Sequence, residues 1–168
     1  ESSAAFLVYC IDFSNIKLSF DIEGGDFDIS NQYEPLLIGS MDVGIAMQNA
    51  TLAAESLGYG IVYCGGVRGF AKGISELLNI PENALFLCGL SIGVIDEEKS
   101  TEKVKPRLPH KANVGYNEFP KSNEEVLKQY RQTMIDFAEA RETKTWTKKF
   151  ADFYAQPSGI EAVTKELL

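Results

Sequence analysis

The chain is 168 residues long, which is the size of a single globular domain with one hydrophobic core. Hydrophobic residues make up 45% and charged residues 24% of the sequence, a composition typical of a folded protein and not of a disordered or fibrous one. The net charge of −8 argues against broad contact with nucleic acid or an anionic membrane, so an anionic ligand must bind at a local cluster of positive charge.

The cysteines and the first residues bear on where the protein works. Three cysteines, Cys10, Cys64 and Cys88, form no C-x-x-C pair, so they predict neither a disulfide framework nor a zinc site, and a reducing cytoplasm suits them. No basic segment precedes an apolar run, and the apolar stretch 4–11 is too short to span a bilayer. Because the sequence lacks an initiator methionine and enters a strand-like run at once, we expect that an upstream portion has been removed.

The first third of the chain predicts a strand, a loop and a long helix. The run 4–11 is rich in β-forming residues and predicts a strand that is covered on both faces. The acidic, glycine-containing stretch 21–26 predicts a solvated loop. A helix is expected over residues 34–57, with Pro35 at its start and Gly58 just past its end.

The helix expected over 34–57 is apolar over most of its circumference, so one stripe cannot hold its apolar residues. Asp42, Gln48 and Glu55 interrupt it too often for a membrane span. Its cover must come from the core of the fold or from a subunit interface, and a homodimer is the natural source in so small a protein. The apolar positions are Leu36, Leu37, Ile38, Met41, Val43, Ile45, Met47, Leu52, Ala53 and Leu57.

Beyond the long helix the sequence predicts two more strands, over 59–63 and 84–94, of which the second is buried. The turn Cys64-Gly65-Gly66 and a helix over 67–78 connect them.

The rest of the chain is more polar, with an extended segment at 104–109. Helical spacing then recurs in Val126, Tyr130, Met134 and Phe137. A further helical piece is expected around Trp146. The sparse apolar spacing favours a carboxy-terminal arm, over about residues 119–168, that lies on another surface.

The first candidate binding segment joins a strand end, two glycines and a helix start in Tyr63-Cys64-Gly65-Gly66-Val67-Arg68. Glycines let backbone N–H groups approach a flat ligand closely, and a helix amino terminus favours an electron-rich or anionic group. A tight strand-to-helix turn without a ligand explains the same residues and is the commoner case for a lone Gly-Gly pair. Arg68 opposes the helix dipole, so it is either an idle surface charge or a ligand for another anion.

The second candidate segment is Lys105-Pro106-Arg107, with Pro109 shortly after it. Prolines forbid a helix, so the side chains of Lys105 and Arg107 project to the same side of an extended chain. Two such cations suit one phosphate, because Arg offers paired donors and Lys a point charge. A solvated basic loop beside an acidic one explains these residues equally well.

No residue is assigned to acid–base or metal chemistry. His110 is the single histidine, and no G-x-S-x-G elbow, Cys/His pair or set of metal ligands accompanies it. We interpret His110 as a surface residue or a neighbour of a phosphate. The cysteines are interpreted as small buried hydrophobic residues, although Cys64 is close enough to the glycine turn to touch a ligand.

Three segments together resemble the nitroreductase family, in the branch of the oxygen-insensitive NADPH nitroreductases and flavin reductases. These segments are GIAMQNATLAAESLG at 44–58, YCGGVR at 63–68 and KPRLP at 105–109. Their order and spacing both match, and the likeness covers about residues 4–118. The tail resembles the carboxy-terminal region of the family only loosely.

The resemblance implies an α+β fold with a mostly antiparallel sheet between helices, in which residues 1–168 form a single domain. It also implies an intertwined homodimer that binds one FMN per subunit at the interface. Arg68 matches a position near the site for NADPH. The residues that the resemblance assigns to FMN are Tyr63, Cys64, Gly65 and Gly66 along the isoalloxazine ring and Lys105 and Arg107 at the phosphate.

The implied activity is a ping-pong oxidoreductase reaction, in which NAD(P)H reduces the flavin and the flavin then passes two electrons to a nitro compound, a quinone or a free flavin. The cofactor performs this chemistry, so no catalytic acid or base needs to be nominated.

The sequence departs from the family at its beginning. Family members start with a helical segment that carries an Arg-Ser-x-Arg type motif, followed by a serine-rich segment, and neither precedes residue 4 here. We therefore expect the domain to be amino-terminally incomplete, and this chain by itself to bind FMN weakly or not at all. The alternative is a non-catalytic flavin-binding or dimerisation protein of the same fold. An unrelated α/β nucleotide-binding protein is less consistent with the sequence, which lacks the G-x-G-x-x-G spacing.

Overall fold

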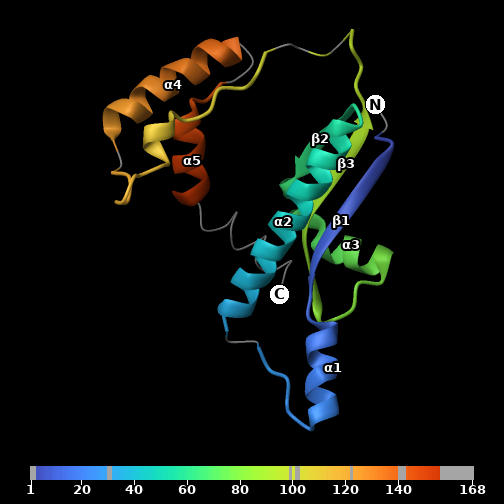
Figure 1. Ribbon diagram of the computed structural model, residues 1–168. Helices are drawn as coiled ribbons and strands as arrows, with labels where there is room; N and C mark the ends of the chain where they lie inside the picture. Colours follow the sequence, from blue (N-terminus) through green and yellow to red (C-terminus); the bar gives the residue numbers. More distant parts are fainter. Residues whose placement is uncertain are drawn as a thin grey trace. The chain divides into compact units, whose positions relative to one another are not determined.

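An antiparallel sheet of three strands organises the first part of the described chain. β1 (Ala5–Asp12) and β2 (Tyr59–Cys64) pair with opposite edges of β3 (Ala84–Val94), so that the strand order is β1-β3-β2 (Figure 1). The computed structural model describes residues 3–29, 32–98, 100, 103–121, 123–139 and 143–155. They divide into two compact units, with the first ending at Ser100 and the second holding residues from Lys103 onward.

The central strand confirms the clearest strand prediction. β3 spans Ala84–Val94, the predicted range, and its Phe86 and Leu90 are the largest fully buried side chains of the described chain. A continuous apolar run is expected of a strand that is covered on both faces. Such a strand fits at the centre of the sheet.

The edge strand differs from the prediction. β1 forms over Ala5–Asp12, but Phe6 and Leu7 on it are exposed in the described chain. The expectation that both of its faces are covered is therefore wrong for the residues described, because an apolar run shows strand propensity without showing which elements lie over it.

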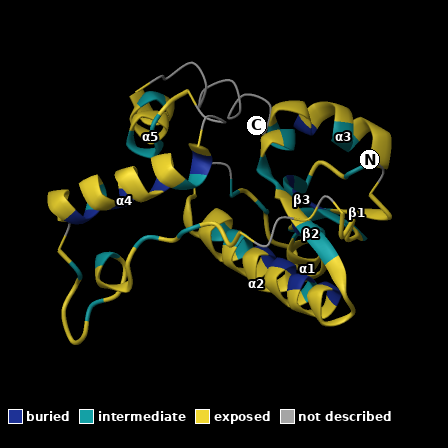
Figure 2. Ribbon diagram, turned by 90° about the horizontal axis from the view of Figure 1, so that it is seen from above, coloured by how far each residue is buried: buried dark blue, intermediate teal, exposed yellow. Residues whose placement is uncertain are grey.

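Helices lie on both sides of the sheet (Figures 1 and 2). α2 (Glu34–Ser56) packs against all three strands, and α3 (Ala71–Leu78) contacts β3 from the other side. A core of Ile11, Val43, Met47 and Leu90 joins β1, α2 and β3. At Gly39 a Cβ would collide with the Ile11 side chain, so this glycine is what lets α2 approach β1 closely.

The segment before α2 holds a helix where a loop was expected. α1 spans Ser14–Glu23 and ends at Gly24, whose φ of 72° is left-handed. The loop expected over 21–26 is therefore partly helical. At the start of α1 the Ser14 amide donates to the Asp12 carboxylate at 2.8 Å. The Ser14 side chain and, to a smaller extent, this amide hold the pKa of Asp12 below its ordinary value.

The long helix is confirmed within one residue at its end, because α2 stops at Ser56 and Gly58 follows with φ 82°. The next helical segment starts earlier than predicted. A 3-10 helix, η1 (Gly65–Phe70), begins at the first glycine itself and leads directly into α3.

The second unit is helical. It contains the short 3-10 helix η2 (His110–Ala112), α4 (Glu124–Ala138) and α5 (Trp146–Ala155). Val126, Tyr130, Met134 and Ala138 are the buried residues of α4, and the Tyr130 ring meets that of Trp146 edge-on at 5.0 Å. Both predicted tail helices therefore exist. The prediction of one domain with an arm over 119–168 stays a prediction.

Candidate functional site

The glycine turn lies where β2 ends and η1 begins. Gly65 and Gly66 are the first two residues of η1, and neither is among the described residues with positive φ. At Gly66 no heavy atom of the described chain lies within 4 Å of the place that a Cβ would occupy. The backbone conformation therefore does not require glycine here, but a side chain at Gly66 would fill open space beside the backbone.

Tyr63 stands at the end of β2, immediately before this turn. The residue is 44% exposed, and its hydroxyl lies 2.7 Å from Thr51 Oγ1 and 3.1 Å from Gln48 Oε1. Both partners come from α2, so the strand end is tied to the long helix. Sequence reasoning noted Gln48 only as a polar interruption and did not single out Thr51, because a contact between a helix and a strand leaves no mark in residue spacing.

The three cysteines are free and half-buried. The Cys64 thiol lies 3.5 Å from the Val62 carbonyl oxygen, which accepts a weak bond from it. Burial raises the pKa of the Cys10 thiol, and the nearby Asp12 carboxylate adds to the effect. A thiol with a raised pKa is a poor nucleophile, so Cys10 is suited to packing and not to covalent chemistry.

Arg68 folds back across the glycine turn. Its Nη1 donates to the Leu87 carbonyl oxygen of β3 at 3.2 Å, and a Cβ at Gly65 would lie 3.3 Å from the same nitrogen. Arg68 is half-buried, and these contacts place its positive charge next to Gly65. The sequence left open whether Arg68 is an idle surface charge or a ligand for an anion, and its role toward NADPH stays a prediction.

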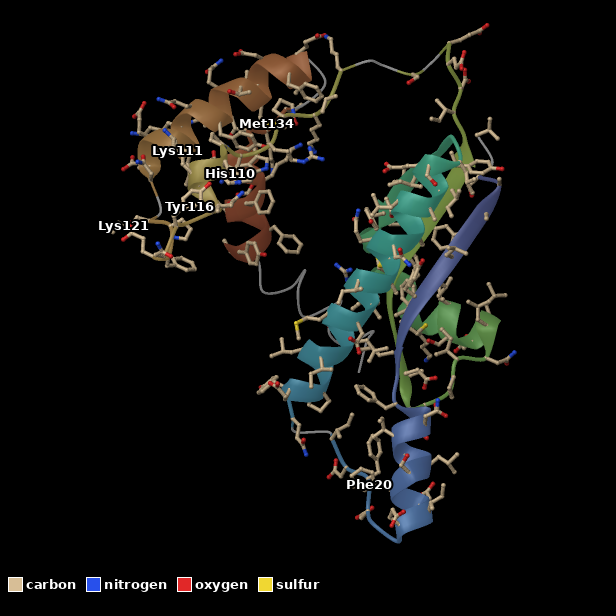
Figure 3. All side chains as sticks on the ribbon, viewed as in Figure 1. Phe20, His110, Lys111, Tyr116, Lys121 and Met134 are labelled. Carbon is tan, nitrogen blue, oxygen red and sulfur yellow. The ribbon has the colours of Figure 1, made fainter. Side chains whose placement is uncertain are left out.

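The other predicted cations belong to the second unit. Lys105 and Arg107 are exposed, and Arg107 Nη1 donates to the Lys105 carbonyl oxygen at 2.9 Å. Between them, the Pro106 carbonyl accepts from the Tyr130 hydroxyl at 3.0 Å, which fastens this segment to α4. His110 is exposed at the start of η2 beside Lys111 (Figure 3).

Among the described residues no group of three or more His, Cys, Asp or Glu side chains could hold a metal ion. None of the helices that the structure describes is long and apolar enough to cross a membrane.

A groove runs along the outer face of α2, the face turned away from the sheet. Its residues are partly apolar and include Gln48, which also binds the Tyr63 hydroxyl. Ile45 is 70% exposed and Leu52 57% exposed in this groove. The lining residues are Met41, Asp42, Gly44, Ile45, Ala46, Gln48, Asn49 and Leu52.

An antiparallel sheet with helices packed on both of its sides makes this an α+β protein. The model of the nitroreductase family matches residues 30–94, and the model of the carboxy-terminal domain of that family matches residues 105–168. The chain belongs to the nitroreductase family.

Individual relatives agree with this assignment. A Cr(VI) reductase of Pseudomonas sp. (strain G-1) is 40% identical over 158 residues, which are 91% of this chain and 63% of the relative. The structure of nitroreductase A from Vibrio parahaemolyticus superposes with a TM-score of 0.80 at 36% identity, covering 99% of this chain and 68% of that one. NADPH:FMN oxidoreductase from Vibrio harveyi, complexed with NAD+, gives a TM-score of 0.78 at 36% identity, with the same coverage of 99% and 68%.

The predicted nitroreductase-like α+β fold is thereby confirmed. The chain spans less than two thirds of the curated relatives that it matches, with 63% of the Cr(VI) reductase and 60% of a flavin oxidoreductase of Vibrio harveyi.

Proposed function

We propose that this chain belongs to an NAD(P)H-dependent oxidoreductase that uses FMN to reduce nitro compounds, quinones or flavins. The names of its relatives support this activity, since they include a Cr(VI) reductase, a nitroreductase and an NADPH:FMN oxidoreductase. When bound, FMN accepts a hydride from NAD(P)H and supplies two electrons to the second substrate in a ping-pong sequence. The observation that carries the proposal is the open space beside the backbone of Gly66, the second residue of η1.

The residues of the glycine turn fit the flat ring of a flavin. Tyr63 is partly exposed, Cys64 is half-buried, and the space beside Gly66 would be filled by any Cβ. Small residues let a planar ligand approach the backbone, where N–H groups can donate to its polar edge. We propose that Tyr63, Cys64, Gly65 and Gly66 bind the isoalloxazine ring.

The three cations are assigned to the anionic parts of the two nucleotides. We propose that Lys105 and Arg107 bind the FMN phosphate, because charge-assisted bonds to phosphate suit both side chains. The Pro106 carbonyl bond to Tyr130 restrains the backbone that carries them. Arg68 is proposed to contact NADPH. No residue of this chain is proposed as a catalytic acid or base.

The outer face of α2 supports a homodimer. Met41, Ile45 and Leu52 are all more than half exposed along the groove of this helix. Contiguous exposed apolar surface marks an interaction site, and a second copy of the chain with the same self-complementary face would cover it. We propose that α2 contributes to the dimer interface and that the protein works in the cytoplasm.

A matched pair of glycine substitutions tests the flavin site. In the protein made from its complete coding sequence, Gly66→Ala should raise the dissociation constant for FMN at least about tenfold, because the new methyl group would occupy the space of the ring. Gly69→Ala is the control, since Gly69 also lies in η1 with no heavy atom of the described residues within 4 Å of its Cβ position. Flavin fluorescence measures both constants. Equal FMN affinity in the two variants would contradict the site.

The same preparation tests the activity. Bound yellow colour that bleaches with NADPH and returns with a nitroaromatic compound or a quinone supports the oxidoreductase. Colour that does not bleach would instead support a non-catalytic flavin-binding protein of the same fold. A colourless protein that binds no added FMN would contradict both.

Comparison of FMN with riboflavin tests the phosphate site, because riboflavin lacks the phosphate. Lys105→Gln combined with Arg107→Gln should raise the dissociation constant for FMN about tenfold or more and leave that for riboflavin within about twofold. Lys111→Gln, which removes an exposed charge from the same unit, should change neither. An equal loss of affinity for FMN and riboflavin would refute the phosphate assignment.

A further inference from the structure

Thr51 is the one buried polar residue among those that the structure describes, and only 4% of the residue is exposed. It lies on the face of α2 that packs against the sheet, where Val43, Met47 and Ala54 are also buried. A buried hydroxyl without a partner costs stability, so its hydrogen bonds account for its presence there. Its partner is the Tyr63 hydroxyl at 2.7 Å.

The direction of the two bonds at Tyr63 follows from counting protons. A tyrosine hydroxyl has one proton to donate, and here that proton goes to Gln48 Oε1 at 3.1 Å. The bond between Thr51 and Tyr63 must therefore use the threonine proton. The result is a directed chain in which the Thr51 hydroxyl donates to Tyr63 and the Tyr63 hydroxyl donates to Gln48.

The two hydrogen-bond partners of the Tyr63 hydroxyl come from one side of α2. Gln48 and Thr51 are three residues apart, so they project from neighbouring positions on one side of the helix. Together they hold the phenol oxygen by both its donor and its acceptor function. Tyr63 is 44% exposed, so its ring is not packed on all sides and packing alone does not fix its orientation.

We infer that Thr51 and Gln48 are positioning residues that fix the Tyr63 ring for contact with the flavin. The inference rests on the proposed function, in which Tyr63 and the following Cys64-Gly65-Gly66 bind the isoalloxazine ring. Neither Thr51 nor Gln48 needs to touch the cofactor. They restrict the phenol to one orientation before binding, which lowers the entropy lost when the flavin stacks beside it.

The inference also explains why a polar residue occupies a core position of an otherwise apolar helix. A valine at position 51 would have nearly the same shape and would avoid the cost of burying a hydroxyl. It would leave the Tyr63 hydroxyl with one bond in place of two. If the Thr51 hydroxyl served only the stability of the fold, its removal would leave the affinity for FMN unchanged.

The test is a double-mutant cycle in the protein made from its complete coding sequence. Thr51→Val should raise the dissociation constant for FMN about fivefold and alter the shape of the visible flavin absorption bands. Thr51→Ser keeps the hydroxyl, so its dissociation constant should stay within about twofold of the parent value and its absorption bands should keep the parent shape. Tyr63→Phe should weaken binding at least as much. Because Thr51 acts through the phenol oxygen, Thr51→Val should add nothing to Tyr63→Phe.

The outcomes separate this inference from the function on which it rests. If the parent protein binds FMN and Thr51→Val binds it equally well with unchanged absorption, the inference is overturned and the proposed function stands. Additive losses in the double variant would overturn it too, because Thr51 would then act independently of Tyr63. A parent protein that binds no FMN overturns both. Tyr63→Phe and Thr51→Ser keep the ring and the hydroxyl respectively, so they carry the test even if Thr51→Val does not fold.

Discussion

Helices α2 and α4 bury their apolar residues in contrasting ways. On α4 the buried residues Val126, Tyr130, Met134 and Ala138 follow one another at intervals of four, and this single stripe accounts for its buried surface. On α2 a similar stripe faces the sheet, but the outer face carries Met41, Ile45 and Leu52, which are more than half exposed. One stripe suffices for a helix that covers a core on one side only. The second apolar face of α2 therefore indicates a second partner.

Truncation of the three methionines should give the largest effect that distinguishes the buried stripes from the outer face of α2. Met47 and Met134 are buried on α2 and α4, whereas Met41 is 61% exposed on the outer face of α2. Met47→Ala and Met134→Ala should each lower the free energy of unfolding by about 2–5 kcal/mol, because each leaves a cavity. Met41→Ala should change it by less than about 0.5 kcal/mol in the dissociated monomer. Urea titration followed by circular dichroism measures all three, and equal losses would remove the distinction between the two faces of α2.

A charge on the outer face of α2 tests what covers it. Ile45→Glu should raise the dissociation constant of the dimer about thirtyfold or more, because a buried apolar contact would be replaced by an unpaired charge. Analytical ultracentrifugation across a range of concentrations measures this constant. Arg131→Glu, an exposed position on α4, is the matched control and should leave association within about twofold. If both variants associate like the parent, a second copy of the chain does not cover this face.

The same contrast shows what the sequence could predict. The range of α2 was predicted because Pro35 and Gly58 bracket a periodic segment. The range of β3 was predicted because a mostly apolar run of strand-forming residues contains no charged residue. Local signals of this kind reside within one element. They cannot show that β1 is an edge strand, since that depends on which elements lie beside it.

The helix α1 was missed for a related reason. Its apolar residues Ile16, Leu18, Phe20 and Ile22 alternate with polar ones, which is the period of a strand, and all four are exposed in the described chain. The Asp12 bond to the Ser14 amide and the left-handed Gly24 mark its ends. These boundary features outweigh the period of the side chains.

The candidate site divides in the same way. The glycine turn and the two exposed cations could be picked out because glycine and proline carry local conformational meaning. The contacts of Tyr63 with α2 and of Arg68 with the Leu87 carbonyl could not, because each joins residues 12 to 19 positions apart in different elements. The sequence therefore supplies the chemistry of the site, while the structure supplies the residues that support it.

The smallest expected effect on the free energy of unfolding comes from the amino termini of the two helices, which differ in their capping. On α4 the Asn123 side chain accepts from the Val126 amide at 3.2 Å, whereas Tyr33 at the corresponding position of α2 makes no side-chain cap. Asn123→Ala should lower the free energy of unfolding by about 1 kcal/mol, because one amide at the helix start loses its acceptor. Asn123→Asp keeps an acceptor oxygen and adds a negative charge near the positive end of the helix dipole, so it should retain the parent stability. Thermal unfolding of the three proteins measures the effect, and a loss in Asn123→Asp equal to that in Asn123→Ala would show that α4 is held by its buried stripe alone.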